Sequence, residues 1–122
     1  MKKRLMLLAV SAALAITVMI LTTDSTLAQN PPRRIEVTAS KFSFAPAEIA
    51  LKKGEPVVLV VHSADAAHGL RFRELNLEVK VDKGSKSEMR FTPDKTGDFV
   101  GHCSVFCGSG HGGMALTLHV TE

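Results

Sequence analysis

The middle of the chain contains the uninterrupted apolar run Val57-Val58-Leu59-Val60-Val61. A short continuous run of β-branched and aliphatic residues is typical of a strand that is covered on both of its faces. The turn signal Lys52-Lys53-Gly54-Glu55 precedes the run, and a loop from Ser63 to Gly69 follows it. We therefore expect this segment to be a central, buried strand of a layered β structure.

Outward from this run, apolar and polar residues alternate with a period of two, which is typical of half-buried strands. The expected strands cover Ile35–Ala39, Ile49–Leu51, Leu75–Val81, Ser87–Phe91, Asp98–Gly101 and Ala115–Val120. The alternation inverts between Ala39 and Phe42, which predicts a bulge or bend that could carry the strand from one sheet to the other. The phenylalanines are expected to fill the core: Phe42, Phe44, Phe72, Phe91 and Phe99.

About seven or eight short strands, separated by turn signals and without a helical apolar stripe, predict the fold class. It is an all-β, antiparallel Greek-key sandwich or barrel, preceded by an N-terminal signal helix. We find no internal repeat and no low-complexity stretch in the sequence.

The first 28 residues are typical of a targeting segment. Lys2-Lys3-Arg4 forms a basic start, Leu5–Leu21 is apolar, and Thr26-Leu27-Ala28 offers a small-residue cleavage site. We expect residues 1–28 to be a signal peptide or an N-terminal anchor, 29–34 a linker, and 35–122 one domain. Export would place that domain in the periplasm, with membrane contact only through an uncleaved N-terminal helix.

The charge balance of the chain argues against one class of function, nucleic-acid binding. The chain has 122 residues, with 15 Lys and Arg against 12 Asp and Glu. Without residues 1–28 the balance is 12 basic to 11 acidic side chains. This near-neutral domain lacks the basic excess of nucleic-acid-binding proteins, so nucleic acid is not an expected partner.

The residues that indicate chemistry lie late in the chain. Cys103, Cys107, His111 and Met114 fall within twelve residues and are separated by glycines that allow a tight loop. Thiolate, imidazole and thioether donors together favour copper, and Met in particular is uncommon at zinc sites. His68 is the best candidate for a further ligand, because loops at one end of a sandwich converge.

The string Cys103-x-x-x-Cys107-Gly108-x-x-His111-x-x-Met114 resembles the binuclear copper (CuA) loop of cytochrome c oxidase subunit II and nitrous oxide reductase. Further motifs extend the resemblance to a cupredoxin domain over roughly residues 35–120: Phe44-x-Pro46, Lys53-Gly54, Asp65…His68-Gly69, Gly84 and Thr96-Gly97-Asp98-Phe99. The chain departs from oxidase relatives in three respects. Relatives attached to oxidases generally carry a transmembrane hairpin, whereas we expect at most one N-terminal helix here, so the chain would be a stand-alone, exported form. It has neither Trp nor Tyr, and Val105 stands where the oxidase family usually has Glu.

The resemblance implies a set of ligands. Cys103 and Cys107 would bridge two copper ions, with His68 on one ion and His111 on the other. Met114 and the backbone carbonyl of Val105 would be weak ligands. The implied function is an exported electron-transfer protein that passes single electrons to or within a respiratory oxidase-type chain. It would not be an enzyme, and its partner would be a redox protein such as a c-type cytochrome or a membrane oxidase.

Three other interpretations stay open at this stage. The two cysteines could form a structural disulfide, since the exported compartment is oxidising. A mononuclear blue-type copper site could use His68, Cys107, His111 and Met114, which would leave Cys103 without a role. The same soft ligands would also suit a periplasmic protein that binds and delivers copper. The remaining histidines are expected to be structural or surface residues: His62, His102 and His119.

Overall fold

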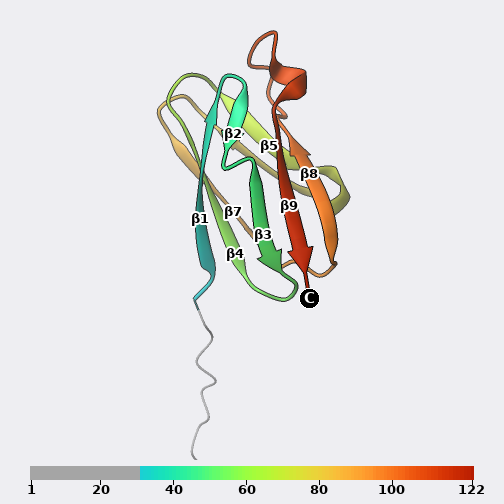
Figure 1. Cartoon of the computed structure of the whole chain (residues 1–122). Coiled ribbons are helices and arrows are strands. Elements are labelled where there is room, and N and C mark those ends of the chain that lie inside the picture. The colour runs from blue at the N-terminus through green and yellow to red at the C-terminus, as the bar shows by residue number, and fades with distance from the viewer. Residues whose placement is uncertain (1–30) are drawn as a thin grey trace, which may run out of the picture. The chain divides into compact units, whose positions relative to one another are not determined.

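A computed structural model describes residues 31–122 of the chain. The expected signal peptide or anchor at 1–28, and the first residues of the expected linker, lie outside the described residues. The described part is an all-β sandwich of two sheets (Figure 1). Within it, no helix is long and apolar enough to cross a membrane.

The first sheet has four strands in the order β2-β1-β4-β7. Its strands are β1 (Arg33–Ser40), β2 (Ser43–Ala45), β4 (Val57–Ser63) and β7 (Lys86–Phe91). The apolar run predicted to be central forms β4, which lies between β1 and β7 and is buried along almost its whole length. Strand β1 begins two residues before the expected start, because Arg33 and Arg34 pair with Val57 and Val58.

The second sheet has five strands in the order β3-β9-β8-β5-β6. Its strands are β3 (Glu48–Lys52), β9 (Ala115–Thr121), β8 (Gly97–His102), β5 (His68–Phe72) and β6 (Leu77–Val81). Two short 3-10 turns connect strands: η1 (Arg73–Leu75) and η2 (His111–Gly113). Leu75, which was expected to begin a strand, therefore belongs to η1, and the strand begins at Leu77.

The prediction of a wholly antiparallel sandwich is wrong for two strand pairs. β1 pairs with β4 in parallel, and β3 pairs with β9 in parallel. The first parallel pair arises because the chain leaves β1 through β2, crosses to the other sheet as β3, and returns as β4 in the original direction. A connection that visits the opposite sheet gives the length that parallel neighbours need.

The predicted change of direction near Phe42 is present as a tight turn at Lys41-Phe42, and β1 and β2 form an antiparallel pair on either side of it. The chain changes sheet only after Ala45. The expectation that Phe42 fills the core is wrong, since its side chain is 38% exposed. Its ring instead lies over the loop between β8 and β9, as described below.

The core lies between the two sheets and is formed by the inward residues of the alternating strands. In β9, for example, Leu116, Leu118 and Val120 are buried while the residues between them are partly exposed. Three connections meet at one end of the sandwich: the Lys41-Phe42 turn, the loop between β4 and β5, and the long loop between β8 and β9 (Figure 1). The candidate ligands lie at this end.

Candidate metal centre

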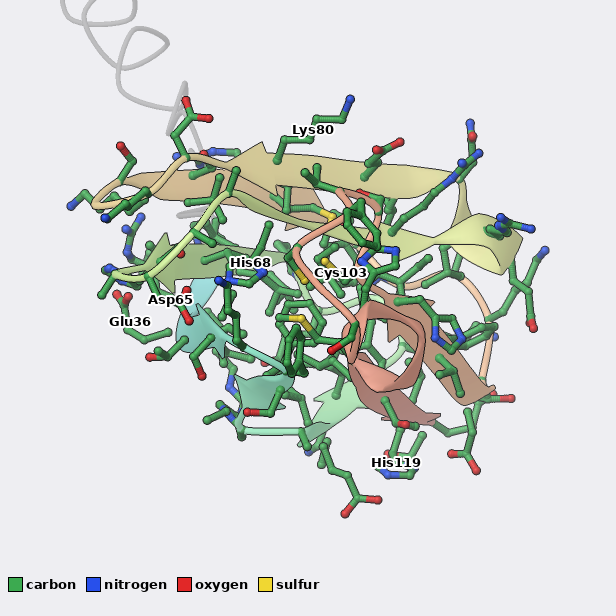
Figure 2. The ribbon with its side chains drawn as sticks, turned by 90° about the horizontal axis from the view of Figure 1, so that it is seen from above. Glu36, Asp65, His68, Lys80, Cys103 and His119 are labelled. Atoms are coloured by element: carbon green, nitrogen blue, oxygen red, sulfur yellow. The ribbon has the colours of Figure 1, made fainter. Side chains whose placement is uncertain are left out.

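His68 is the first residue of β5 and has no exposed surface. The buried strand β4 delivers the chain to the loop 64–67, and the antiparallel pairing of His68 with Val81 fixes the backbone of β5. Viewed from above, His68 and Cys103 lie near the middle of the molecule (Figure 2). A fully buried imidazole requires a hydrogen-bond partner or a metal, because its polar nitrogens are costly to desolvate.

The other candidate ligands come from the loop that joins β8 to β9. Cys103 follows the last residue of β8, and Met114 precedes the first residue of β9. A backbone hydrogen bond of 3.1 Å from the Cys103 amide to the Met114 carbonyl closes the base of this loop. The loop is therefore pinned at both ends by strands of the same sheet.

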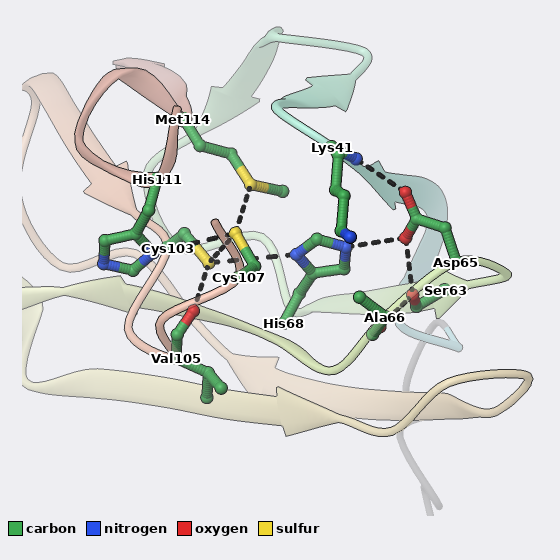
Figure 3. A network of polar contacts seen from close by, with 10 residues as sticks. All are labelled: Lys41, Ser63, Asp65, Ala66, His68, Cys103, Val105, Cys107, His111 and Met114. Carbon is green, nitrogen blue, oxygen red and sulfur yellow. Dashed lines mark hydrogen bonds and ion pairs between the residues drawn. The ribbon is translucent and has the colours of Figure 1, made fainter. Parts of the chain in front are cut away.

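Cys103 and Cys107 are free thiols whose sulfur atoms lie 3.8 Å apart, so no disulfide joins them in this structure. Each sulfur faces a different imidazole. His68 Nδ1 lies 4.0 Å from Cys103 Sγ, and His111 Nδ1 lies 3.7 Å from Cys107 Sγ. In Figure 3 the two rings lie on opposite sides of the sulfur pair.

Two weaker donors complete the cluster. The Met114 thioether is fully buried, with Sδ 3.9 Å from Cys107 Sγ. The Cys103 thiol donates a hydrogen bond of 3.2 Å to the carbonyl oxygen of Val105. The structure thus brings together all six residues singled out from the sequence: His68, Cys103, Val105, Cys107, His111 and Met114.

The orientation of His68 is set by Asp65, three residues earlier. Its Nε2–H donates to Asp65 Oδ1 at 2.8 Å, which leaves the lone pair of Nδ1 facing the sulfurs. The Lys41 backbone amide donates to the other carboxylate oxygen of Asp65 at 2.7 Å (Figure 3). These two hydrogen bonds, that from Lys41 first, lower the pKa of Asp65 to about 2. Such carboxylate–histidine contacts fix the tautomer and ring orientation of metal ligands.

Close packing against two glycines positions the metal loop. A Cβ atom at Gly110 would lie 2.4 Å from two ring carbons of Phe42, and one at Gly108 would lie 2.9 Å from two others. At the base of the loop, a Cβ at Gly69 would lie 2.0 Å from Ser104 Oγ. The Lys41-Phe42 turn therefore contacts both parts of the centre, through Asp65 on one side and the glycines on the other.

The supporting roles of Phe42 and Asp65 were not predicted from the sequence. Phe42 was expected in the core, and no spacing in the sequence connects it with residues more than sixty positions later. Asp65 is part of a motif in the sequence, and no role was predicted for it. Its position three residues before His68, in a turn, is the signal from which the contact with His68 could have been inferred.

The remaining histidines lie outside the donor cluster. His62 is hydrogen-bonded to Glu36 on the face of the first sheet. His119 Nδ1 lies 2.6 Å from Asp98 Oδ1 on the second sheet, and this hydrogen bond is the main reason that the pKa of His119 is raised. His102 is exposed at the end of β8.

The donor chemistry fits copper. Two thiols, two imidazoles and a thioether lie together at one end of the sandwich, and soft sulfur donors of this kind select copper over magnesium or calcium. Among residues 31–122, the ligand atoms of His68, Cys103 and Cys107 all lie within 4.8 Å of one another. Desolvation, assisted by the neighbouring Cys103 thiol, raises the pKa of the Cys107 thiol. Metal binding at these thiols would therefore release protons.

A β-sandwich that gathers sulfur and imidazole donors in loops at one end defines a class of copper-binding domain, and comparisons with known proteins agree with that class. The model of the cupredoxin-like domain family matches residues 10–114. The chain therefore belongs to the cupredoxin-like domain family.

Two proteins of known function support the relationship predicted from the loop. Cytochrome c oxidase subunit 2 of Thermus thermophilus is 32% identical over 88 residues, which are 72% of this chain and 65% of that protein. Nitrous-oxide reductase of Cupriavidus necator is 28% identical over 81 residues, which are 63% of this chain and 13% of that protein. The chain thus spans less than two thirds of the length of either relative.

A solved structure agrees with the fold. The periplasmic domain of cytochrome oxidase subunit II (CoxB) of Bradyrhizobium japonicum matches with a TM-score of 0.68 and 19% identity, covering 77% of this chain and 87% of that one. The predicted resemblance to the oxidase subunit II and nitrous oxide reductase family is confirmed, as is copper as the metal of the family.

Proposed function

We propose that the chain is an exported electron-transfer protein with a binuclear copper centre of the CuA type. Its ligands would be His68, Cys103, Cys107, His111, Met114 and the carbonyl of Val105. It would exchange single electrons with a redox protein, such as a c-type cytochrome or a membrane oxidase, in a respiratory chain. The domain from residue 35 to 122 would carry this function in the periplasm.

The observation that supports this proposal most strongly is the pairing of each thiol with its own imidazole. The two sulfurs are 3.8 Å apart, and the nearest imidazole nitrogens lie 4.0 Å and 3.7 Å from different sulfurs. Two metal ions between the sulfurs would each have a histidine on the outer side. A structural disulfide would leave this arrangement of His68 and His111 without a purpose.

The same geometry counts against the mononuclear set of His68, Cys107, His111 and Met114. A single ion bound by His68, Cys107 and His111 needs their donor atoms to lie close together, because metal–nitrogen and metal–sulfur bonds are only about 2.0–2.3 Å long. In the described part of the chain, the compact donor set is instead His68, Cys103 and Cys107. His111 approaches from the side of Cys107 and lies outside that set.

The chain's own residues provide the rigidity that electron transfer needs. Copper bound here supplies a one-electron oxidation–reduction couple. Asp65 holds His68 by a 2.8 Å hydrogen bond, and the strands β8 and β9 hold both ends of the cysteine loop. Ligands fixed in this way change position little between oxidation states, which keeps the barrier to electron transfer low. The fully buried Met114 excludes water from one side.

The test is copper titration of the reduced protein under anaerobic conditions, followed by visible absorption and EPR spectroscopy. We expect two equivalents of copper and a mixed-valence centre whose EPR hyperfine pattern has seven lines. One equivalent with a four-line pattern would support the mononuclear site instead. Tight colourless Cu(I) binding without a stable oxidised centre would support copper delivery.

Cys103→Ser separates the two copper sites directly. It should abolish the mixed-valence spectrum of a binuclear centre, whereas a mononuclear site using Cys107 would survive. Met89→Leu is the matched control, because Met89 is a buried sulfur-containing residue of β7 that takes no part in the cluster. This control variant should bind copper like the parent protein.

A further inference from the structure

A cleft opens beside the metal loop on the outer face of the second sheet. Its volume is about 540 Å³, and it is lined by Arg71, Arg73, His102, Cys103, Ser104 and His111. Two of these residues, Cys103 and His111, belong to the proposed ligand set. The cleft therefore gives a partner molecule close access to the metal centre.

The cleft carries positive charge that no lining carboxylate neutralises. Arg71 of β5 lies opposite His102 of β8, and Arg73 follows in η1. The nearest carboxylate to Arg71 is that of Glu78 on β6, 3.9 Å from Nε, and both side chains are exposed. Glu78 offsets part of the charge of Arg71, whereas among the described residues no carboxylate lies within ion-pairing distance of Arg73. Lys80, opposite Gly69 in the same sheet, adds a further positive charge nearby.

The carboxylates that pair with His119 on this sheet lie away from the cleft. They contact His119 farther along β8 and β9, whereas Arg71 and Arg73 lie near the metal loop. Asp98 and Glu48 lie 2.6 Å and 3.5 Å from the ring nitrogens of His119. The domain as a whole is nearly neutral, so the positive region is a local feature and not a consequence of overall charge. A local positive region of this kind orients an approaching negatively charged partner.

An exposed aromatic ring borders the cleft. Phe106, between the two cysteines, is 79% exposed, and its ring centroid lies 5.6 Å from that of His111. Val100 of β8, two residues before His102, is also exposed. Large exposed apolar side chains next to a charged rim are typical of a surface that binds another protein.

We propose that this cleft, with Phe106 at its border, is the docking surface for a redox partner protein with an acidic rim. Arg71 and Arg73 would bind carboxylates of the partner, for which the planar guanidinium group is well suited. Phe106 would pack against an apolar patch around the partner's cofactor. One electron then passes between that cofactor and the copper centre by way of the His111 side, and no bond forms or breaks.

This inference rests on the proposed function, and it adds a separate prediction: the partner's surface is negatively charged. A partner with a lysine-rich rim would be repelled by the same cleft. The variants that test it change neither a ligand nor a residue that contacts one through a hydrogen bond.

The test compares two c-type cytochromes of similar potential, one with an acidic rim and one with a lysine-rich rim. Second-order electron-transfer rates with the copper-loaded protein are measured by stopped flow at about 10 and 200 mM ionic strength. We expect the acidic cytochrome to react at least about 10-fold faster at low salt, and its advantage to fall as salt screens the charges. A lysine-rimmed cytochrome that reacts faster at low salt would overturn the proposal.

Charge reversal locates the surface. Arg71→Glu with Arg73→Glu should lower the rate with the acidic cytochrome about 10-fold or more at low salt. The matched control is Arg34→Glu with Arg90→Glu, because these two exposed arginines of the other sheet are ion-paired with Glu88 and their reversal changes the net charge by the same amount. This control should change the rate less than about twofold. Equal losses in both variants would overturn the proposal, since they would reflect overall charge alone.

A binding measurement keeps the two proposals apart. Chemical-shift mapping of the metal-free protein with the acidic cytochrome requires no electron transfer, and the shifts should cluster at residues 71–73, 100–102 and 106. Arg71→Glu with Arg73→Glu should weaken this binding while leaving the EPR spectrum of the copper-loaded protein unchanged. Shifts elsewhere would overturn the docking proposal even if the binuclear centre is present. Conversely, an unexpected EPR spectrum with the expected shifts would contradict only the proposed function.

Discussion

The contact between Phe42 and the metal loop can be tested by adding a single methyl group. In Gly110→Ala the new Cβ would lie 2.4 Å from two carbons of the Phe42 ring and 3.0 Å from its Cβ. Favourable carbon–carbon contacts have separations of about 3.5–4.0 Å, so the overlap exceeds ~1 Å. The backbone of Gly110 has φ −88°, which alanine adopts without strain, so any effect is due to packing.

The expected cost follows from how freely Phe42 can move. Its ring is partly exposed, but the preceding amide of Lys41 is held by Asp65 at 2.7 Å. Overpacking of a constrained contact typically costs about 1–3 kcal/mol. For a domain of this size, each kcal/mol lowers the melting temperature by about 4–8 °C. We therefore expect Gly110→Ala to melt several degrees below the parent protein.

The assay is thermal unfolding of the reduced, metal-free protein, followed by circular dichroism, with copper affinity measured in parallel. Gly112→Ala and Gly113→Ala are the controls, because a Cβ at either glycine meets no atom within 4 Å. These variants should be neutral or slightly stabilised, by at most about 1 kcal/mol, since alanine restricts the unfolded chain. Phe42→Ala should remove most of the cost of Gly110→Ala, giving a coupling energy of about 1–3 kcal/mol in a double-mutant cycle.

The contact between Phe42 and Gly110 is refuted if Gly110→Ala melts at the same temperature as Gly112→Ala. It is refuted equally if Phe42→Ala and Gly110→Ala have additive effects, because the two residues would then not be in contact. Either result would mean that the Lys41-Phe42 turn does not support the metal loop.

Two further predictions concern the carboxylates that contact histidines. Asp65→Asn should weaken copper binding about 10–100-fold in competition with a chelator, because the supporting contact to His68 loses its charge. Asp94→Asn, an exposed aspartate between β7 and β8, should leave the affinity unchanged, and an equal loss in both variants would contradict this role. Asp98→Asn removes the negative charge of the carboxylate whose hydrogen bond raises the pKa of His119. The folded state favours the charged imidazole of His119. This interaction therefore adds to the free energy of unfolding below the pKa of the unfolded state, about 6.5. The contribution is lost as the pH rises through the higher pKa of the folded state. The parent protein should therefore melt above Asp98→Asn at about pH 5.5 and lose this advantage by about pH 9; a difference independent of pH would exclude the charged pair as its source.

Local sequence patterns predicted the individual strands well. The apolar run of β4 and the alternation of β9 specify which faces are buried, and those faces are buried in the structure. The ligand cluster was predictable for a related reason. Cys103 and Met114 flank strands whose ends must lie at the same end of the sheet, and His68 follows the central strand that leads to that end.

Longer-range features could not be predicted in the same way. The direction in which two strands pair depends on the route of the connection between them, so the parallel pairs of β1 with β4 and β3 with β9 left no local signal. The position of Phe42 likewise depends on a distant loop that offers two glycines to its ring. The cleft beside Arg71 depends on the single register pair between β5 and β8.

The directions of β1 and β9 determine where another segment can be joined to the domain without covering the metal loop. β1 begins, and β9 ends, at the end of the sandwich opposite to the metal loop (Figure 1). The eight residues of β1 span about 26 Å. An attachment point at the start of β1 is therefore separated from the metal loop by most of the length of the domain. A tether, a fused domain or an affinity tag joined at either position would leave the loop pointing outward and unobstructed. The domain can thus be attached to another protein at the end opposite to the metal loop, and the metal loop then stays accessible to diffusing partners.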